Sequence, residues 1–236
     1  MVIFQIMLIS YLYQVCAGTR MRKLTIIYLL FISVYWINPV ELTIKYRDGS
    51  SEIRSYPDNT EKINFTYGAG RNITEIVGLE YFPRLKELWL GMTAFIRDYN
   101  FLEKLNTLEV LVFQDIQFSD INFLYGINSL KRLIFQSCRL GDNIIDASKL
   151  PYLEYFECTN SQLVKFPIEI KERRKIDTIN IAYNNIEDIT IPNYMDILII
   201  AVGNPLLVTG TKKIITGPRG TDIYNILPEN YRQYLR

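Results

Sequence analysis

The chain has no histidine among its 236 residues. This absence excludes Ser-His-Asp and Cys-His nucleophilic sites, acid–base catalysis by imidazole, and metal sites built on histidine. Cysteine is almost as scarce, since only Cys16, Cys138 and Cys158 occur. So small a set falls short of a structural metal site. The sequence therefore predicts no catalytic residues and no metal ligands.

A dominant charge of one sign is also missing. The 26 Lys and Arg residues are balanced by 25 Asp and Glu residues, for a formal net charge of +1. No electrostatic footprint therefore points to nucleic acid. Nucleotide-binding fingerprints are absent too, because the glycine pair Gly68 and Gly70 lacks a third glycine and follows no clear strand. We expect neither nucleic acid nor a cofactor among the ligands.

What the chain does contain is a repeat. Six segments share the pattern apolar-x-x-apolar-x-apolar-x-x-small/polar-x-apolar, and they begin at Leu85, Leu108, Leu130, Leu153, Ile176 and Ile197, at intervals of 23, 22, 23, 23 and 21 residues. In the sixth copy the pattern places Ile197, Ile200 and Val202 at core positions, ahead of Asn204. A degenerate copy precedes the six, with core positions Ile63, Phe65 and Ile73.

Each copy predicts a short strand, because its apolar residues alternate with period two and so face one side. One coil buries little surface alone, whereas stacked coils share a continuous core. We therefore expect the strands of successive coils to pair side by side in a parallel sheet.

This pattern resembles the leucine-rich repeat family, whose period is roughly 20–29 residues, and it is closest to the bacterial short-repeat, internalin-like type. The resemblance implies an α/β fold: a right-handed curved coil, or solenoid, with a parallel β-sheet on its concave face. On the convex face it implies short helices, expected at residues 99–105 and 121–127, or extended segments, expected at 166–170.

The family usually has asparagine three residues after the last strand apolar, where stacked side chains form a hydrogen-bonded ladder. Here Asn184 alone among these positions is asparagine. The other copies have Thr93, Ile116, Cys138 and Ser161 there, which predicts a partial ladder.

The two cysteines of the repeats, Cys138 and Cys158, fall on core positions of adjacent coils. They are either two buried free thiols or a disulfide, and a disulfide requires Cα atoms within about 7 Å.

Four parts are predicted along the chain. Residues 1–40 form a hydrophobic export signal or an uncleaved anchor, with Met21 as a possible true start, because Arg22 and Lys23 precede the uncharged stretch 24–37. Residues 41–60 form an N-terminal cap hairpin around the turn Asp48-Gly49. Residues 61–207 form the leucine-rich repeat domain, and residues 208–236 form a C-terminal cap or tail, with a possible short helix at 226–236.

The residues between the core positions of each strand point away from the core, which makes them candidates for binding. Aligned across the coils, one column contains Trp89, Val112, Ile134, Glu157 and Asn180, and its neighbour contains Gly91, Gln114, Gln136, Thr159 and Ala182. An exposed apolar patch is expected at Trp89, Met92, Val112 and Ile134. The predicted binding residues are Trp89, Met92, Val112, Gln114, Ile134, Gln136, Tyr155, Glu157, Asn180 and Tyr183.

Because the family mostly binds proteins, the resemblance implies a non-catalytic binding module that recognises a protein partner through the concave sheet. The basic-then-apolar N-terminus favours an exported or surface-attached monomer, in a secreted, periplasmic or cell-surface location. The alternatives are an intracellular scaffold or one anchored in a membrane through residues 24–37.

Overall fold

The computed structural model describes residues 39–66, 72–91, 93, 95–171, 176–189, 196–206, 213–226 and 229. The chain divides into two compact units, Met1–Pro39 and Val40–Arg236, and the description below concerns the second. Over the described ranges, no helix has both the length and the apolar character needed to cross a membrane. The predicted signal or anchor at residues 24–37 lies outside those ranges, as does almost all of the helix predicted at 226–236.

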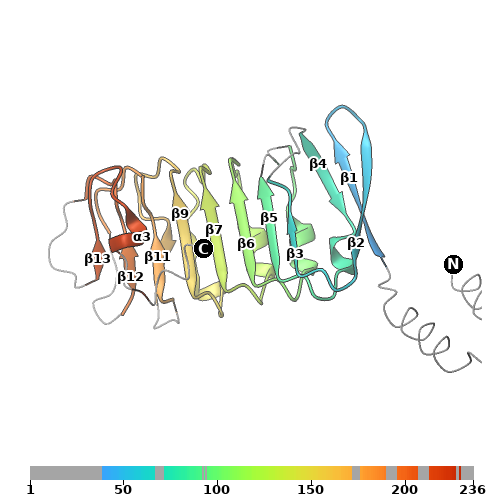
Figure 1. Ribbon diagram of the computed structural model, residues 1–236. Coiled ribbons are helices and arrows are strands. Elements are labelled where there is room, and N and C mark those ends of the chain that lie inside the picture. Colours follow the sequence, from blue (N-terminus) through green and yellow to red (C-terminus); the bar gives the residue numbers. More distant parts are fainter. Residues whose placement is uncertain are drawn as a thin grey trace, which may run out of the picture. The chain divides into compact units, whose positions relative to one another are not determined.

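The fold is α/β and is built on an eight-stranded sheet, in which all neighbouring strands are parallel (Figure 1). The predicted parallel sheet is therefore confirmed. In spatial order its strands are β13 (Ile214–Ile215), β12 (Leu198–Ile200), β11 (Thr178–Asn180), β9 (Tyr155–Thr159), β7 (Arg132–Gln136), β6 (Val110–Gln114), β5 (Glu87–Gly91) and β3 (Lys62–Asn64).

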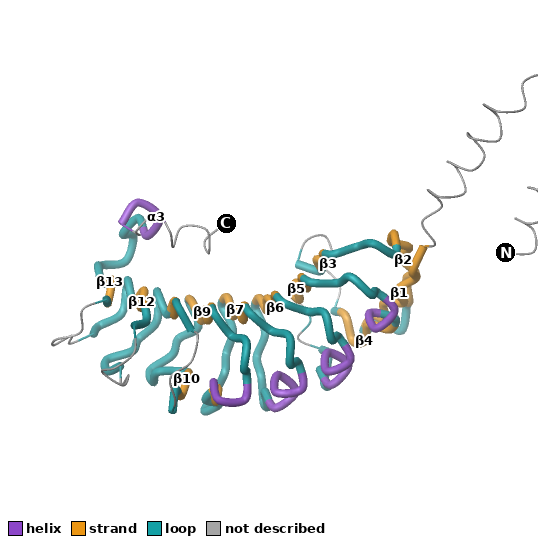
Figure 2. Tube along the Cα trace, turned by 90° about the horizontal axis from the view of Figure 1, so that it is seen from below, coloured by secondary structure: helices purple, strands orange, loops and turns teal. Residues whose placement is uncertain are grey.

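The connections between these strands are short and lie mainly on one side of the sheet (Figure 2). They contain the 3-10 helices η1 (Leu79–Tyr81), η2 (Asn100–Lys104), η3 (Asn122–Gly126) and η4 (Ala147–Lys149), and a two-stranded parallel sheet of β8 (Ile145–Asp146) and β10 (Ile168–Glu169). The short helices predicted at 99–105 and 121–127 are thus single 3-10 turns, and the segment predicted as extended contains β10. The one α-helical turn in the described ranges, α3 (Ile223–Ile226), lies on the opposite side of the sheet.

A separate three-stranded sheet begins the unit, in the order β2 (Ser51–Pro57), β1 (Pro39–Tyr46) and β4 (Ile73–Val77). The β1–β2 turn contains Gly49, which has φ of 82° and donates its N–H to Tyr46 O at 3.0 Å. Leu42 and Ile44 of β1 are fully buried, and β1 also pairs with β4 in antiparallel register. This second pairing was not apparent in the sequence, because it joins segments about 30 residues apart.

The strand register agrees with the alignment of the repeats. Trp89 pairs with Val112, Val112 with Ile134, Ile134 with Glu157, and Glu157 with Asn180. The neighbouring column from Gly91 through Gln114 and Gln136 to Thr159 is also in register. The first five copies were therefore aligned correctly.

The sixth copy was aligned wrongly by one residue. Ile179 pairs with Ile199, so Ile199 and Ala201 enter the main core, while Ile200 and Val202 face the other side of the sheet. A slip of one residue exchanges the two faces of a strand. The spacing between the fifth and sixth copies is shorter than the others, and the aligned position is Asp196, so the apolar pattern fits Ile197 instead.

The main core joins residues from all three sheets and from the short helices into one apolar cluster. Its centre is aromatic. The Phe113 ring stacks on Phe135 at a centroid distance of 5.5 Å and meets Phe118, Phe123 and Tyr99 edge to face at 4.9, 5.9 and 5.5 Å. Such rings supply most of the apolar area that a small coil can bury.

The predicted ladder is present in part. The Asn184 amide donates to Cys158 O at 2.7 Å and to Ile181 O at 2.9 Å, and its oxygen accepts from the N–H groups of Ser161 and Leu163 at 2.8 and 3.2 Å. One coil earlier, Ser161 Oγ accepts from the Cys138 N–H at 3.1 Å.

A second asparagine continues this ladder at the other end. Asn204 donates to Ile181 O at 2.8 Å and accepts from Ile186 N–H at 3.0 Å. Sequence reasoning did not assign Asn204 to the ladder, because the register slip in the sixth copy moved it out of phase. The spacing from Asn184 to Asn204 was the signal that could have corrected the register.

Candidate binding face

The side of the eight-stranded sheet that carries Trp89, Val112, Ile134, Glu157 and Asn180 is called the open face here. The short helices η1–η4 lie on the other side (Figure 2). On the open face the side chains stand in rows across successive strands, because parallel strands in register place equivalent residues next to each other.

An apolar cluster occupies the middle of the open face. Val112, Ile134 and Tyr155 form it, and Trp89 and Val110 pack against it. Val112 and Tyr155 have no exposed surface, and Ile134 is 6% exposed. The expected exposure of Val112 and Ile134 is therefore wrong: neighbouring side chains on the same face cover them, and the half-buried Trp89 is the accessible part of this cluster.

A carboxylate network lies beside this cluster. Glu157 is only 8% exposed, and its oxygens accept hydrogen bonds from Tyr155 Oη at 2.6 Å, Thr159 Oγ1 at 3.1 Å, Asn180 Nδ2 at 3.2 Å and Gln136 Nε2 at 3.4 Å. Four donors satisfy this buried carboxylate. Burial raises the pKa of Tyr155, and the charge on Glu157 raises it further, so the phenol stays protonated and serves as a donor.

Charged groups frame the N-terminal end of the open face. Lys62 Nζ lies 2.7 Å from Glu87 Oε1 and 4.8 Å from the centroid of the Trp89 ring. The Trp89 indole N–H donates to Glu87. These contacts orient the indole, and cation–π contacts of this kind are most favourable with tryptophan. Nearer the middle, the Arg132 guanidinium lies 5.2 Å from the centroid of the Tyr155 ring.

A groove of about 250 Å³ runs along this face. Six predicted binding residues line it: Trp89, Ile134, Gln136, Glu157, Asn180 and Tyr183. Val112, Gln114 and Tyr155 belong to the same face, but they do not line the groove. Met92 lies outside the described residues. The groove wall also contains Glu87, Val110, Arg132, Thr159, Ala182 and Ile223, which were not among the predicted binding residues.

The C-terminal end of the open face carries a second apolar cluster. Ala182, Leu198, Ile200 and Val202 are buried there, and Tyr183, Ile215 and Ile223 pack against them. Sequence reasoning missed this cluster, although the uninterrupted apolar run at residues 197–202 was a signal of burial on both faces. The described part of the tail, Ile223 above all, covers this end of the sheet.

The two described cysteines are free and buried. Burial raises the pKa of both the Cys138 and the Cys158 thiols to about 12, whereas a thiolate nucleophile requires a lowered pKa. Nor does any group of three or more metal-binding side chains come together within the described ranges.

Thiol labelling tests this assignment. In a chain in which Cys16 is replaced by serine, we expect Cys138 and Cys158 to react with iodoacetamide at pH 8 at least about 100-fold more slowly than in urea, because the native thiols are buried and protonated. Mass spectrometry of the labelled peptides measures both rates. Fast native labelling of either cysteine contradicts its burial.

No protein-family model matches this sequence, and a search of curated proteins finds no match either.

Proposed function

We propose that this chain is a leucine-rich repeat solenoid and that its open face, as the concave side of the sheet, binds a protein partner without catalysis. The observation that carries the proposal is the groove, whose lining combines the half-buried Trp89, aliphatic side chains packed near it and the amide of Gln136. Aromatic anchors within a polar surround are typical of binding hot spots. The uniform repeat and the asparagine ladder support the family assignment.

The surface chemistry favours a polypeptide ligand of mixed character. Aliphatic and aromatic side chains offer apolar contact, and Gln114 and Gln136, adjacent in register and both half-buried, offer amide groups. Such groups can bond to a peptide backbone, whose N–H and C=O groups need partners when buried. Export through residues 24–37 is part of the proposal, and the mature N-terminus of the native protein, read by mass spectrometry, tests it.

A peptide-display selection on the immobilised full chain tests the binding face. We expect Trp89→Ala to lower the affinity for the selected peptides about 10- to 100-fold, since tryptophan anchors are among the costliest interface residues to truncate. Gln136→Ala should lower this affinity less. Affinity is measured by fluorescence anisotropy, and the circular dichroism spectrum confirms that each variant is folded.

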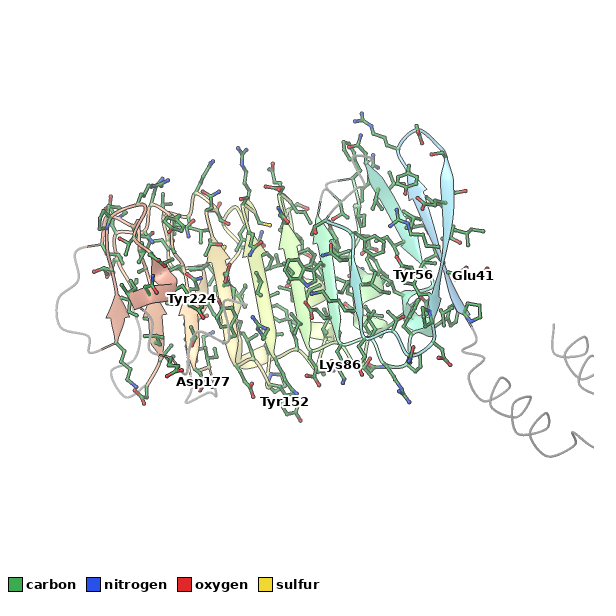
Figure 3. The ribbon with its side chains drawn as sticks, viewed as in Figure 1. Glu41, Tyr56, Lys86, Tyr152, Asp177 and Tyr224 are labelled. Carbon is green, nitrogen blue, oxygen red and sulfur yellow. The ribbon has the colours of Figure 1, made fainter. Side chains whose placement is uncertain are left out.

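Tyr152→Ala is the matched control. Tyr152 is 60% exposed, lies along the same edge of the sheet as Lys86 and Asp177, where the strands begin (Figure 3), and does not line the groove. If Trp89→Ala binds the selected peptides as tightly as the Tyr152→Ala control does, the open face is not the binding face.

A further inference from the structure

The C-terminal part of the described chain returns over the open face. After β13, Gly217 O accepts a hydrogen bond from Gly203 N–H at 2.7 Å. The chain then turns and places residues 221–226, called the strap here, over β11 and β12 (Figures 1 and 2). Ile223 packs there against Ala182, Leu198, Ile200 and Val202.

The strap is lightly held. The helix α3 has four residues and none of them is buried. Tyr224 and Ile226 are 39% and 42% exposed. Tyr183 Oη donates to Thr221 O over a long 3.4 Å. Elements with few buried contacts are the first to open in a folded protein.

Tyr183, whose hydroxyl donates to Thr221 O of the strap, has an unusual backbone conformation. Tyr183 has φ of 62°, and the equivalent positions of the other coils, with φ between 51° and 74°, hold Asp115, Ser137, Asn160 and Gly203. Three of these four, Asp115, Asn160 and Gly203, are residue types that tolerate the left-handed region, whereas a bulky aromatic there is strained. Such strain persists where surrounding contacts compensate for it. The Tyr183 ring makes those contacts, against the backbone at Gly203 and beneath the strap.

The surface beneath the strap is continuous with the groove. Tyr183 and Ile223 form one end of the groove, and Trp89 lies at the other end on β5. Leu198 and Ile200 extend the same rows of side chains onto β12, next to Thr178 and Asn180. Without the strap, these buried aliphatic residues would prolong the apolar part of the open face.

We propose that the partner-binding surface extends beneath the strap and that the strap occupies part of the site to which the partner binds. The inference rests on the proposed function. It also names the chemistry of the ligand: a polypeptide segment that presents a branched aliphatic side chain from a short helical turn, as Ile223 does. The strap and the partner compete for Ala182, Leu198, Ile200 and Val202.

A synthetic fluorescent peptide of residues 217–226 is the probe. It is titrated by anisotropy against the full chain and against two full-length variants, Ile223→Asp and Ile226→Asp. Ile223→Asp puts a charge on the apolar cluster and should release the strap, while Ile226→Asp changes an exposed residue of the same helix and is the matched control. Hydrogen exchange of residues 213–226 reports the release.

We expect the Ile223→Asp chain to bind the probe about tenfold more tightly than the unmodified chain, as it should if the strap is closed in about nine of ten molecules. The Ile226→Asp chain should resemble the unmodified chain, and a probe that itself carries Ile223→Asp should not bind. A second release variant, Tyr183→Asn, relieves the backbone strain and should also speed exchange in the strap.

Two results would overturn the inference. In one, exchange in the strap is unchanged in both release variants, so Ile223 and Tyr183 do not hold it. In the other, the strap is released but the probe binds no more tightly. Failure of the proposed function has a different readout. In that case Trp89→Ala would leave the affinity for display-selected peptides unchanged, whether or not the strap is released.

Discussion

Replacing Phe113 with alanine is expected to lower the free energy of unfolding by about 3–5 kcal/mol. Phe113 has no exposed surface, and its ring contacts four other aromatic rings, two from its own repeat and one from each neighbouring repeat. Truncation removes the apolar transfer energy of the ring and leaves a cavity that rigid neighbours cannot fill. A domain is stable by only about 5–15 kcal/mol in total, so the loss is a large share of the stability.

Urea unfolding followed by circular dichroism measures this loss. The midpoint should fall while the slope m stays constant, because the area exposed on unfolding is nearly unchanged. Phe113→Leu retains part of the apolar volume, so its free energy of unfolding should fall clearly less than that of Phe113→Ala. Equal losses for leucine and alanine would mean that ring packing contributes nothing at this position.

Replacing Asn184 with alanine is expected to lower the free energy of unfolding by about 2–5 kcal/mol. Asn184 is 1% exposed and satisfies two backbone carbonyls and two backbone N–H groups from two adjacent coils. Each buried polar group left without a partner costs about 1–3 kcal/mol, although such costs do not simply add. The loss should also uncouple β9 from β11, since the amide bridges the turns that follow these strands.

Two variants give the graded comparison. Asn184→Ser introduces the residue type that Ser161 provides at the same position one coil earlier, so it should lose less than alanine. Asn204→Ala removes the last asparagine of the ladder, which is only partly buried. This change should lower the free energy of unfolding by about 1–2 kcal/mol. The stabilities are again measured in urea. If Asn184→Ala unfolds at the same urea midpoint as Asn204→Ala, the buried Asn184 contributes no more to stability than the partly buried Asn204.

Much of the face that we propose for binding could be predicted without the structure. Trp89, Val112, Ile134, Glu157 and Asn180 stand in one row, as the alignment of the repeats required. Their burial could not be predicted, because exposure depends on what lies over a side chain. Val112 is covered by neighbours on its own face, and no pattern within one strand encodes that cover.

The repeat alone determined the parallel sheet, the core face of the first five copies and the rung at Asn184, because each depends on spacing between residues near one another in the chain. The tertiary structure decided which segment covers the open face of the last copy. The contact of Tyr183 with Thr221 spans 38 residues, and Ile223, which follows β13 in the chain, packs against the cluster that contains Leu198 and Ile200. Such contacts form only when the tail folds back over the sheet. The apolar run at 197–202 indicates burial on both faces, but local periodicity does not say which segment covers it.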